Sequence, residues 1–360
     1  MRDLFQPGQE RKKGPFRALV LVVFSSLSLL YRLVHGARLF LYRSGLRKGA
    51  RLRARVISVG NLTVGGTGKT PLVICLAEKL RAEGEKPAIL TRGYKRKKKE
   101  MLDLTQISRD QFNWRDTGDE PYLLANRLSD VPIIVARNRC SSGDYTVEKH
   151  GARYLLMDDG FQHLRLFRDT DIVVIDSTNP FGNGKLLPAG PLREPLSSLK
   201  RADIFVLTKT DQAADKEELV AMLRRYNPGA PIVESVYQVR SIERLSDGSP
   251  VEPDEVRNKK ALAFSGIGNP LSFENTLNHL GIQVLRHRKF RDHFAYESKD
   301  ILELDREAES LGVDLIVTTE KDSVRIPLIN ELKIPIHVLK IDLKVTDGEE
   351  ILLKKVKGKP

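Results

Sequence analysis

The chain has 360 residues, of which 41% are hydrophobic and 30% are charged. This length accommodates two domains of ordinary size, and the composition is that of a soluble globular protein. Its two cysteines, Cys75 and Cys140, exclude a disulfide framework and a four-cysteine zinc site. Such sparse cysteine usage fits a catalytic body in the reducing cytoplasm.

The net charge of +13 is concentrated near the N-terminus. Residues 1–55 carry thirteen Lys and Arg against two acidic residues, a net of +11, which leaves +2 for the rest of the chain. This asymmetry indicates a basic arm, residues 1–49, attached to a nearly neutral body.

Within the arm, residues 18–31 form an uncharged run of fourteen residues between Arg17 and Arg32. A full bilayer span needs about 20 apolar residues, so the run is short for crossing a membrane. More apolar positions follow in 33–42, interrupted by Arg38, which favours a membrane-associated helix with its basic residues toward anionic head groups. A buried core helix and a cleaved signal peptide stay open as alternatives, although no clear small-residue cleavage site follows.

Basic residues also serve nucleic-acid binding, usually beside stacking aromatic residues. Here they bracket an apolar segment, which favours lipid, so no nucleic-acid partner is expected. A second basic run, residues 95–99, is either a solvated loop or a segment that contacts lipid or nucleic acid.

The most informative stretch is VISVGNLTVGGTGKTP, residues 56–71. A β-branched run ends in a glycine-rich turn, and Gly-Lys-Thr then opens a helical pattern, which predicts a phosphate-binding loop. Lys69 would bring a cation to the β- and γ-phosphates, and the Thr70 hydroxyl would ligate Mg²⁺. The usual pattern has a glycine where this chain has Thr63. The predicted nucleotide-binding residues are Thr63, Val64, Gly65, Gly66, Thr67, Gly68, Lys69 and Thr70.

Apolar runs bounded by turns recur along the body at the spacing of βα units. They predict strands at 56–59, 88–90, 133–136, 154–157, 172–175 and 204–207, with helices at 71–81 and 120–128. Most of the runs lack strict alternation, which is typical of strands covered on both faces of a parallel sheet. The pattern predicts a doubly wound, P-loop NTPase-like α/β domain at 50–230.

The C-terminal part repeats the α/β pattern on a smaller scale. Residues 231–258 are expected to be a connector with short strands, and 259–360 a second, smaller α/β domain. Its strands are predicted at 261–264, 283–285, 315–318 and 336–339, with helices near 271–280 and 298–311. The lysine-rich tail 354–360 is expected to fray. A long loop rich in Pro and Gly, residues 177–200, is expected to be functional.

A second chemical signal is the segment YLLMDDGFQH, residues 154–163. Its apolar strand ends in Asp158 and Asp159, at the place where phosphate-loop enzymes hold Mg²⁺. An ordinary Asp-Gly turn is the alternative. His163 on its own reads as a structural histidine.

Three segments together resemble the tetraacyldisaccharide 4′-kinase family, the lipid A 4′-kinases. They are GNLTVGGTGKTP at 60–71, DDGFQH at 158–163 and PFGNGKLLPAGPLREP at 180–195. Shorter matches at 91–94, 118–121, 263–270, 292–294 and 318–322 extend the resemblance over most of the body. The family shares the departure at Thr63.

The resemblance implies transfer of the γ-phosphate of ATP, with Mg²⁺, to the 4′-hydroxyl of a tetraacyldisaccharide 1-phosphate. It implies that Asp119 takes the hydroxyl proton and that His293 pairs with Asp119, as a poor nucleophile requires. Lys69 would neutralise charge on the transferred group, while Thr70, Asp158 and Asp159 would serve the metal. The implied supporting residues are His163, Arg193 and Glu194.

The implied partner is a membrane-embedded lipid A disaccharide precursor. The enzyme would be associated with the bacterial inner membrane, with its catalytic body on the cytoplasmic side and no obligate protein partner. A rival hypothesis is a membrane-associated regulatory P-loop GTPase or ATPase. It rests on Thr208-Lys-Thr-Asp211, which resembles the guanine-reading Asn-Lys-x-Asp motif but has Thr in place of Asn.

Overall fold

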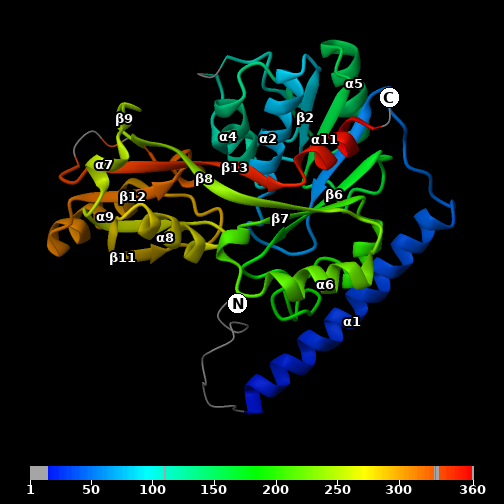
Figure 1. Ribbon diagram of the computed structural model, residues 1–360, viewed down its shortest axis with the longest axis horizontal. Helices are drawn as coiled ribbons and strands as arrows, with labels where there is room; N and C mark the ends of the chain where they lie inside the picture. Colours follow the sequence, from blue (N-terminus) through cyan, green and yellow to red (C-terminus); the bar gives the residue numbers. More distant parts are fainter. Residues whose placement is uncertain (1–14, 109–110, 328, 330–331, 359–360) are drawn as a thin grey trace.

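The computed structural model describes residues 15–108, 111–327, 329 and 332–358 (Figure 1). All thirteen strands within these residues belong to one sheet, in the order β11-β10-β12-β13-β8-β7-β6-β1-β5-β2-β4-β3, with β9 paired to β8. The first half comprises β1 (Arg55–Gly60), β2 (Pro87–Thr91), β3 (Leu102–Asp103), β4 (Ile133–Val135), β5 (Tyr154–Asp158), β6 (Thr170–Asp176) and β7 (Ile204–Thr208). Each predicted strand of this half overlaps one of these, and the predicted α/β fold class is confirmed.

The first half is doubly wound, because helices cover both faces of its mostly parallel strands. On one face, α2 (Lys69–Ala82) and α4 (Asp119–Arg127) cover a core that includes Ile57 and Val174. The other face packs against α5 (Arg139–His150), the 3₁₀ helix η3 (Leu196–Arg201) and α6 (Lys216–Tyr226). Alternate residues of a strand point to opposite faces, so strands covered on both faces are apolar throughout. The short elements of this half are α3 (Trp114–Thr117) and the 3₁₀ helix η4 (Thr210–Gln212).

The second half is a smaller set of parallel strands, β11-β10-β12-β13, drawn in yellow to red in Figure 1. Its elements are β9 (Pro250–Val251), α7 (Pro253–Val256), β10 (Lys260–Ser265), α8 (Pro270–His279), β11 (Gln283–Lys289), α9 (Ser298–Leu311), β12 (Leu315–Thr319), α10 (Glu320–Ser323) and β13 (Ile336–Asp347). The predicted strands and helices of this region all overlap these elements. Two apolar clusters, one on each face, form its core.

The two halves are joined by a ribbon of two long strands. The segment expected to be a connector with short strands forms β8 (Ile232–Arg244), a strand of thirteen residues. It starts parallel to β7 and then pairs antiparallel with β13 from Glu234↔Asp347 to Arg244↔His337. The sheet therefore continues from one half into the other, and the domain boundaries at 230 and 259 stay a prediction.

The chain returns to the first half at its C-terminal end. The expected frayed tail is wrong over its described part, because α11 (Glu349–Lys357) packs on the first half. Leu352 and Val356 are fully buried there, which stabilises the fold by about 1.5–3 kcal/mol for each side chain. Arg55 adds a hydrogen bond from Nε to the carbonyl oxygen of Val356 at 2.7 Å.

The predicted N-terminal helix is present as α1 (Pro15–Arg43), which extends along one edge of the molecule (Figure 1). Among the described residues, no helix has the length and apolar character needed to cross a bilayer. Large apolar side chains of α1 are exposed, including Leu30, Leu33 and Phe40, which argues against a buried core helix. Some of its polar side chains contact the long loop instead: Ser28 donates a hydrogen bond to the carbonyl oxygen of Leu186 at 2.9 Å, and Tyr31 donates one to that of Arg193 at 2.7 Å. Residues 1–14 of the predicted arm lie outside the described residues.

Candidate active site

The glycine-rich loop leaves the end of β1 and leads directly into α2, which begins at Lys69. Gly68 adopts a left-handed conformation with φ 95°, and a Cβ atom there would lie 2.6 Å from the Tyr237 hydroxyl oxygen. Glycine is therefore required for both backbone and steric reasons. The turn aims the free amides at the N-terminus of α2 into one space, as a phosphate-binding loop does.

The structure also explains why Thr63 can replace the usual first glycine. Thr63 forms a β-bridge with Leu192, and the Val64 amide donates to the carbonyl oxygen of Pro191 at 2.8 Å. The long loop 177–200 therefore fixes the start of the phosphate loop through backbone pairing. Further along, Asn61 Nδ2 donates to Thr67 Oγ1 at 3.0 Å from beneath the loop.

The Thr208-Lys-Thr-Asp211 segment also supports the phosphate loop. Thr208 Oγ1 donates to the carbonyl oxygen of Thr67 at 3.0 Å, and Lys209 forms a buried ion pair with Asp176. Thr208 is therefore engaged in holding the loop, and the charge of Lys209 is paired with Asp176. This arrangement weakens the hypothesis that the segment reads a guanine base.

Asp159 is held by two cations at the mouth of the loop. Its carboxylate accepts two hydrogen bonds from Arg193 Nη1, at 2.8 and 2.9 Å, and lies 3.6 Å from Lys69 Nζ. Burial alone would raise its pKa, but the charges of Lys69 and Arg193 outweigh burial and hold the pKa at about 2. Asp159 therefore stays ionised and links the long loop to the loop lysine.

Asp158 has a very different environment, although it is the next residue. It is 2% exposed, and neither carboxylate oxygen has a hydrogen-bond partner among the described groups. Burial, together with the charge of Glu120, raises its pKa to about 7. Val59 pairs in register with Asp158, so the phosphate loop and this carboxylate leave the same edge of the sheet.

An unpartnered carboxylate beside a phosphate loop fits a bound cation, since Mg²⁺ is usually held by one or two protein oxygens together with phosphate oxygens. Among the described residues there is no cluster of three or more acidic, histidine or cysteine side chains that could hold a metal alone. The donors present, Asp158 and the Thr70 hydroxyl, therefore match a metal that arrives with a nucleotide.

Asp119 and His293 meet although they are 174 positions apart in the sequence. Asp119 is the first residue of α4, and its Oδ2 lies 2.6 Å from Nδ1 of His293, which follows β11. Burial would raise the pKa of Asp119, but the hydrogen bond with His293 and the charges of Lys321 and Arg325 hold it at about 2. The predicted contact between these two side chains is therefore present.

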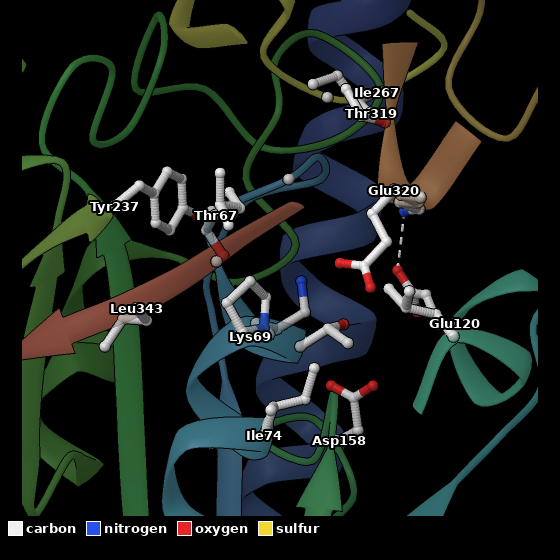
Figure 2. Close-up of a pocket in the computed structure, with 18 of the residues that line it drawn as sticks. Thr67, Lys69, Ile74, Glu120, Asp158, Tyr237, Ile267, Thr319, Glu320 and Leu343 are labelled. Carbon is white, nitrogen blue, oxygen red and sulfur yellow. Dashed lines mark hydrogen bonds and ion pairs between the residues drawn. The ribbon is translucent and has the colours of Figure 1, made fainter. Parts of the chain in front are cut away.

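A cavity of about 1000 Å³ extends across the two halves and connects the loop to this pair. Figure 2 shows Lys69 and Asp158 facing the same space as Glu120 and Glu320. Tyr237 of β8 and Leu343 of β13 line the side of the cavity that the two long strands form. Its lining includes Gly65, Gly66, Gly68, Lys69, Thr70, Tyr94, Glu120, Asp158, Asp159, Arg193, Lys209, Tyr237, Asn269, His293 and Lys321. Val64 and Thr67 also line it, so the predicted loop residues other than Thr63 face the cavity.

Two of the predicted supporting residues, Glu194 and His163, do not line the cavity. Glu194 is 1% exposed and pairs with Arg201 at 2.8 Å, with His35 of α1 at 3.4 Å. His163 does not line the cavity, and its pKa is lowered to about 4 by burial and by nearby arginines. Sequence reasoning missed Lys209, Tyr237 and Lys321. Lys209 and Lys321 lie inside segments that the sequence singles out, but a lysine gives no sequence signal that it faces a cavity.

The fold and the site together define a class, a phosphate-loop nucleotide-binding protein whose loop shares a cavity with an Asp–His pair. Comparison with known proteins is more specific. The family model described as tetraacyldisaccharide-1-P 4′-kinase matches residues 20–357, and the chain belongs to this family.

Similar proteins agree with this assignment. The tetraacyldisaccharide 4′-kinase of Syntrophus aciditrophicus is 38% identical over 94% of this chain and 92% of its own length. That of Halothermothrix orenii is 40% identical over 85% of this chain and 83% of its own length. The crystal structure of LpxK from Aquifex aeolicus in complex with ATP is similar at a TM-score of 0.72 and 31% identity, covering 94% of this chain and 98% of that one.

Proposed function

We propose that this protein transfers the γ-phosphate of ATP to the 4′-hydroxyl of a tetraacyldisaccharide 1-phosphate in lipid A synthesis. The observation that carries the proposal is the single cavity that joins the phosphate loop to the Asp119–His293 pair. A phosphoryl donor on the loop and a hydroxyl beside the pair would face each other in it. Membership of the 4′-kinase family supplies the identity of the acceptor.

The Asp119–His293 pair is assigned the proton of the sugar hydroxyl. His293 lines the cavity, whereas Asp119 is 4% exposed and lies behind it. A carboxylate whose pKa is held near 2 is a weak base alone, so the pair accepts the proton as a unit. The expectation from the sequence has Asp119 take the proton with His293 paired to it, whereas here both residues together are assigned the proton.

The phosphate site is assigned to residues of the loop and the β5 end. Lys69 would neutralise charge on the transferred group, and Arg193 would hold Asp159 and through it Lys69. Thr70 and Asp158 would hold Mg²⁺, with Asp159 beside them. The ion supplies charge neutralisation across the β- and γ-phosphate oxygens when it is bound. Glu194 and His163 would support the site from outside the cavity.

We also assign the enzyme to the cytoplasmic side of the bacterial inner membrane. The support is the exposed apolar surface of α1 together with the basic residues of the arm, which suit an anionic lipid interface. At this membrane surface the enzyme would reach its lipid acceptor.

The test is phosphate transfer in detergent from γ-labelled ATP or GTP to a tetraacyldisaccharide 1-phosphate. We expect label in the lipid from ATP with wild-type protein, and a loss of orders of magnitude in Lys69→Ala and Asp119→Ala. GTP hydrolysis without lipid labelling would overturn the proposal in favour of the GTPase. Near-normal transfer by Asp119→Ala would remove the proton assignment alone.

A further inference from the structure

We propose that Arg325 is a positioning residue for the Asp119–His293 pair, a role that rests on the proposed function of that pair. Arg325 follows α10 in the segment Thr318–Arg325 and is 1% exposed. A fully buried guanidinium is costly unless its donors are satisfied and its charge is paired. The partners that satisfy it explain what it does.

Its Nε donates to the carbonyl oxygen of Lys321 at 3.2 Å, and its Nη atoms reach the backbone around His293. Arg325 Nη1 donates to the carbonyl oxygen of Phe294 at 3.0 Å, and Nη2 donates to that of Gly266 at 3.3 Å. The Gly266 carbonyl also accepts the hydrogen bond of the His293 amide, at 3.1 Å. The guanidinium therefore holds the backbone of Phe294, the residue after His293. It also holds the Gly266 carbonyl, which accepts a hydrogen bond from the His293 amide.

This segment needs such a clamp, because His293 adopts the left-handed conformation with φ 59°. A residue with a side chain rarely adopts that conformation, so the surroundings must impose it. The loop also has a second anchor: Asp322 accepts from the Gly266 amide at 2.9 Å and from the Tyr296 hydroxyl at 2.9 Å. Asp322 is in turn the ion-pair partner of Arg325, at 2.5 Å.

The same guanidinium also faces the carboxylate of the pair. Arg325 Nε lies 3.7 Å from Asp119 Oδ2, the oxygen that contacts His293. The other charged groups at the pair are Lys321, Glu120 and Asp292, and Lys321 Nζ lies 3.0 Å from Glu120 and 3.8 Å from Asp292. Arg325 thus links both members of the pair: it fixes the backbone of one and places a positive charge beside the other.

The first experiment compares kinase turnover in full-length wild type, Arg325→Lys and Arg325→Met in detergent. A misplacement of about 1 Å at a reacting centre can lower turnover about 100-fold. We expect kcat to fall by about that factor in Arg325→Met, with a smaller fall in Arg325→Lys, while KM for ATP stays near the wild-type value. The acidic limb of the kcat–pH profile should move to higher pH, because removing the cation favours protonation of the pair.

Arg168→Met is the matched control. Arg168 forms an ion pair with Asp171 at 2.8 Å, is also largely buried and lies in the first half. The Arg168→Met variant should be less stable than wild type, but the acidic limb of its kcat–pH profile should not move. An Arg325→Met protein that melts cooperatively yet keeps wild-type kcat and pH profile would show that Arg325 is structural only.

Arg325→Met leaves Asp322 buried without its partner, which can unfold the protein. Tyr296→Phe avoids this problem, since it removes one hydroxyl from Asp322 and keeps every charge. It should lower kcat in the same direction by less, at unchanged KM for ATP. Wild-type kcat in both Tyr296→Phe and Arg325→Lys overturns the inference. Absence of lipid labelling by the wild-type enzyme would instead overturn the proposed function.

Discussion

Asp158 and Asp159 are adjacent, yet their environments push their pKa values in opposite directions. Asp159 is paired with Arg193 and Lys69, whereas the oxygens of Asp158 have no partner among the described groups. Two neighbouring carboxylates can therefore have separate tasks, one holding the lysine and the other open to a cation.

This difference gives a prediction for metal dependence. In wild type, Mg²⁺ should increase the stabilisation that ATP gives, because a ligand of the folded state stabilises it more, at a given concentration, the more tightly it binds. Asp158→Asn should abolish the Mg²⁺ increment, measured as the shift in melting temperature with ATP and with or without Mg²⁺. Asp130→Asn, at an exposed ion pair, is the control. A full Mg²⁺ increment in Asp158→Asn would contradict the assignment.

His163 gives a prediction for pH. An unfolded histidine binds a proton near pH 6.5, whereas the pKa of folded His163 is lowered to about 4 by burial and by Arg139 and Arg168. The unfolded state therefore gains protons first, and the free energy of unfolding should fall as the pH drops from 6.5 toward 4. His163→Gln should reduce this fall between pH 7.5 and 5 in urea titrations, while the exposed His279→Gln should not. Equal falls in all three proteins would refute the idea.

At the scale of single residues, the sequence predicted those whose role depends on neighbours within a few positions along the chain. The phosphate loop and the two aspartates could be read directly, because glycines and strand ends act within a few residues. The Asp119–His293 contact came only from family resemblance, since it joins two distant segments. Arg325 and Lys209 are buried by tertiary partners, and charged residues in a sequence give no sign of burial.

At the scale of the element, the phosphate loop depends on one backbone conformation. Gly68→Ala should cost about 1–2 kcal/mol of stability for the left-handed conformation and, in addition, weaken ATP binding through the collision with Tyr237. Gly84→Ala is the matched control, because Gly84 has φ +77° and a Cβ atom added there would meet nothing within 4 Å. Urea unfolding and calorimetric ATP titration measure the two effects. Unchanged ATP affinity in Gly68→Ala would count against the loop as the phosphate site.

Elements were predictable where burial is uniform. The strands of the first half other than the two-residue β3 contain apolar runs and were predicted, whereas β8 alternates between buried, half-buried and exposed residues and carries several charges. Its long pairing with β13 is set by a distant strand, not by its own sequence. Helix α11 was not predicted because its lysines face outward and only Leu352 and Val356 are fully buried.

At the scale of the whole molecule, the halves meet at a backbone contact beside the phosphate loop. A Cβ atom on Gly268 would lie 2.0 Å from the amide nitrogen of Gly66. Gly268→Ala should therefore push the second half away from the loop and lower both ATP affinity and turnover, with the circular dichroism spectrum unchanged. Gly229→Ala is the control, because a Cβ atom added there would meet nothing closer than 3.9 Å. Wild-type kinetics in Gly268→Ala would show that the contact is dispensable.

The exposed surface of α1 gives a prediction about location. Replacing Leu30, Leu33 and Phe40 by Gln should reduce sedimentation with vesicles that contain anionic phospholipid, because these side chains are 58%, 63% and 64% exposed. Turnover on detergent-dispersed acceptor should stay near wild type. Leu271→Gln, an equally exposed leucine on α8, is the control. Undiminished sedimentation of the triple variant would place lipid binding elsewhere.

The return of the chain through β13 to α11 has a consequence for biosynthesis. The core beneath the phosphate loop is closed by Leu352 and Val356, which leave the ribosome long after the glycine-rich turn. A growing chain that already contains every residue of that turn therefore still lacks part of the packing that secures it. The core of the first half is complete only once α11 has been synthesised, so a truncation that removes α11 takes packing away from the N-terminal half of the chain.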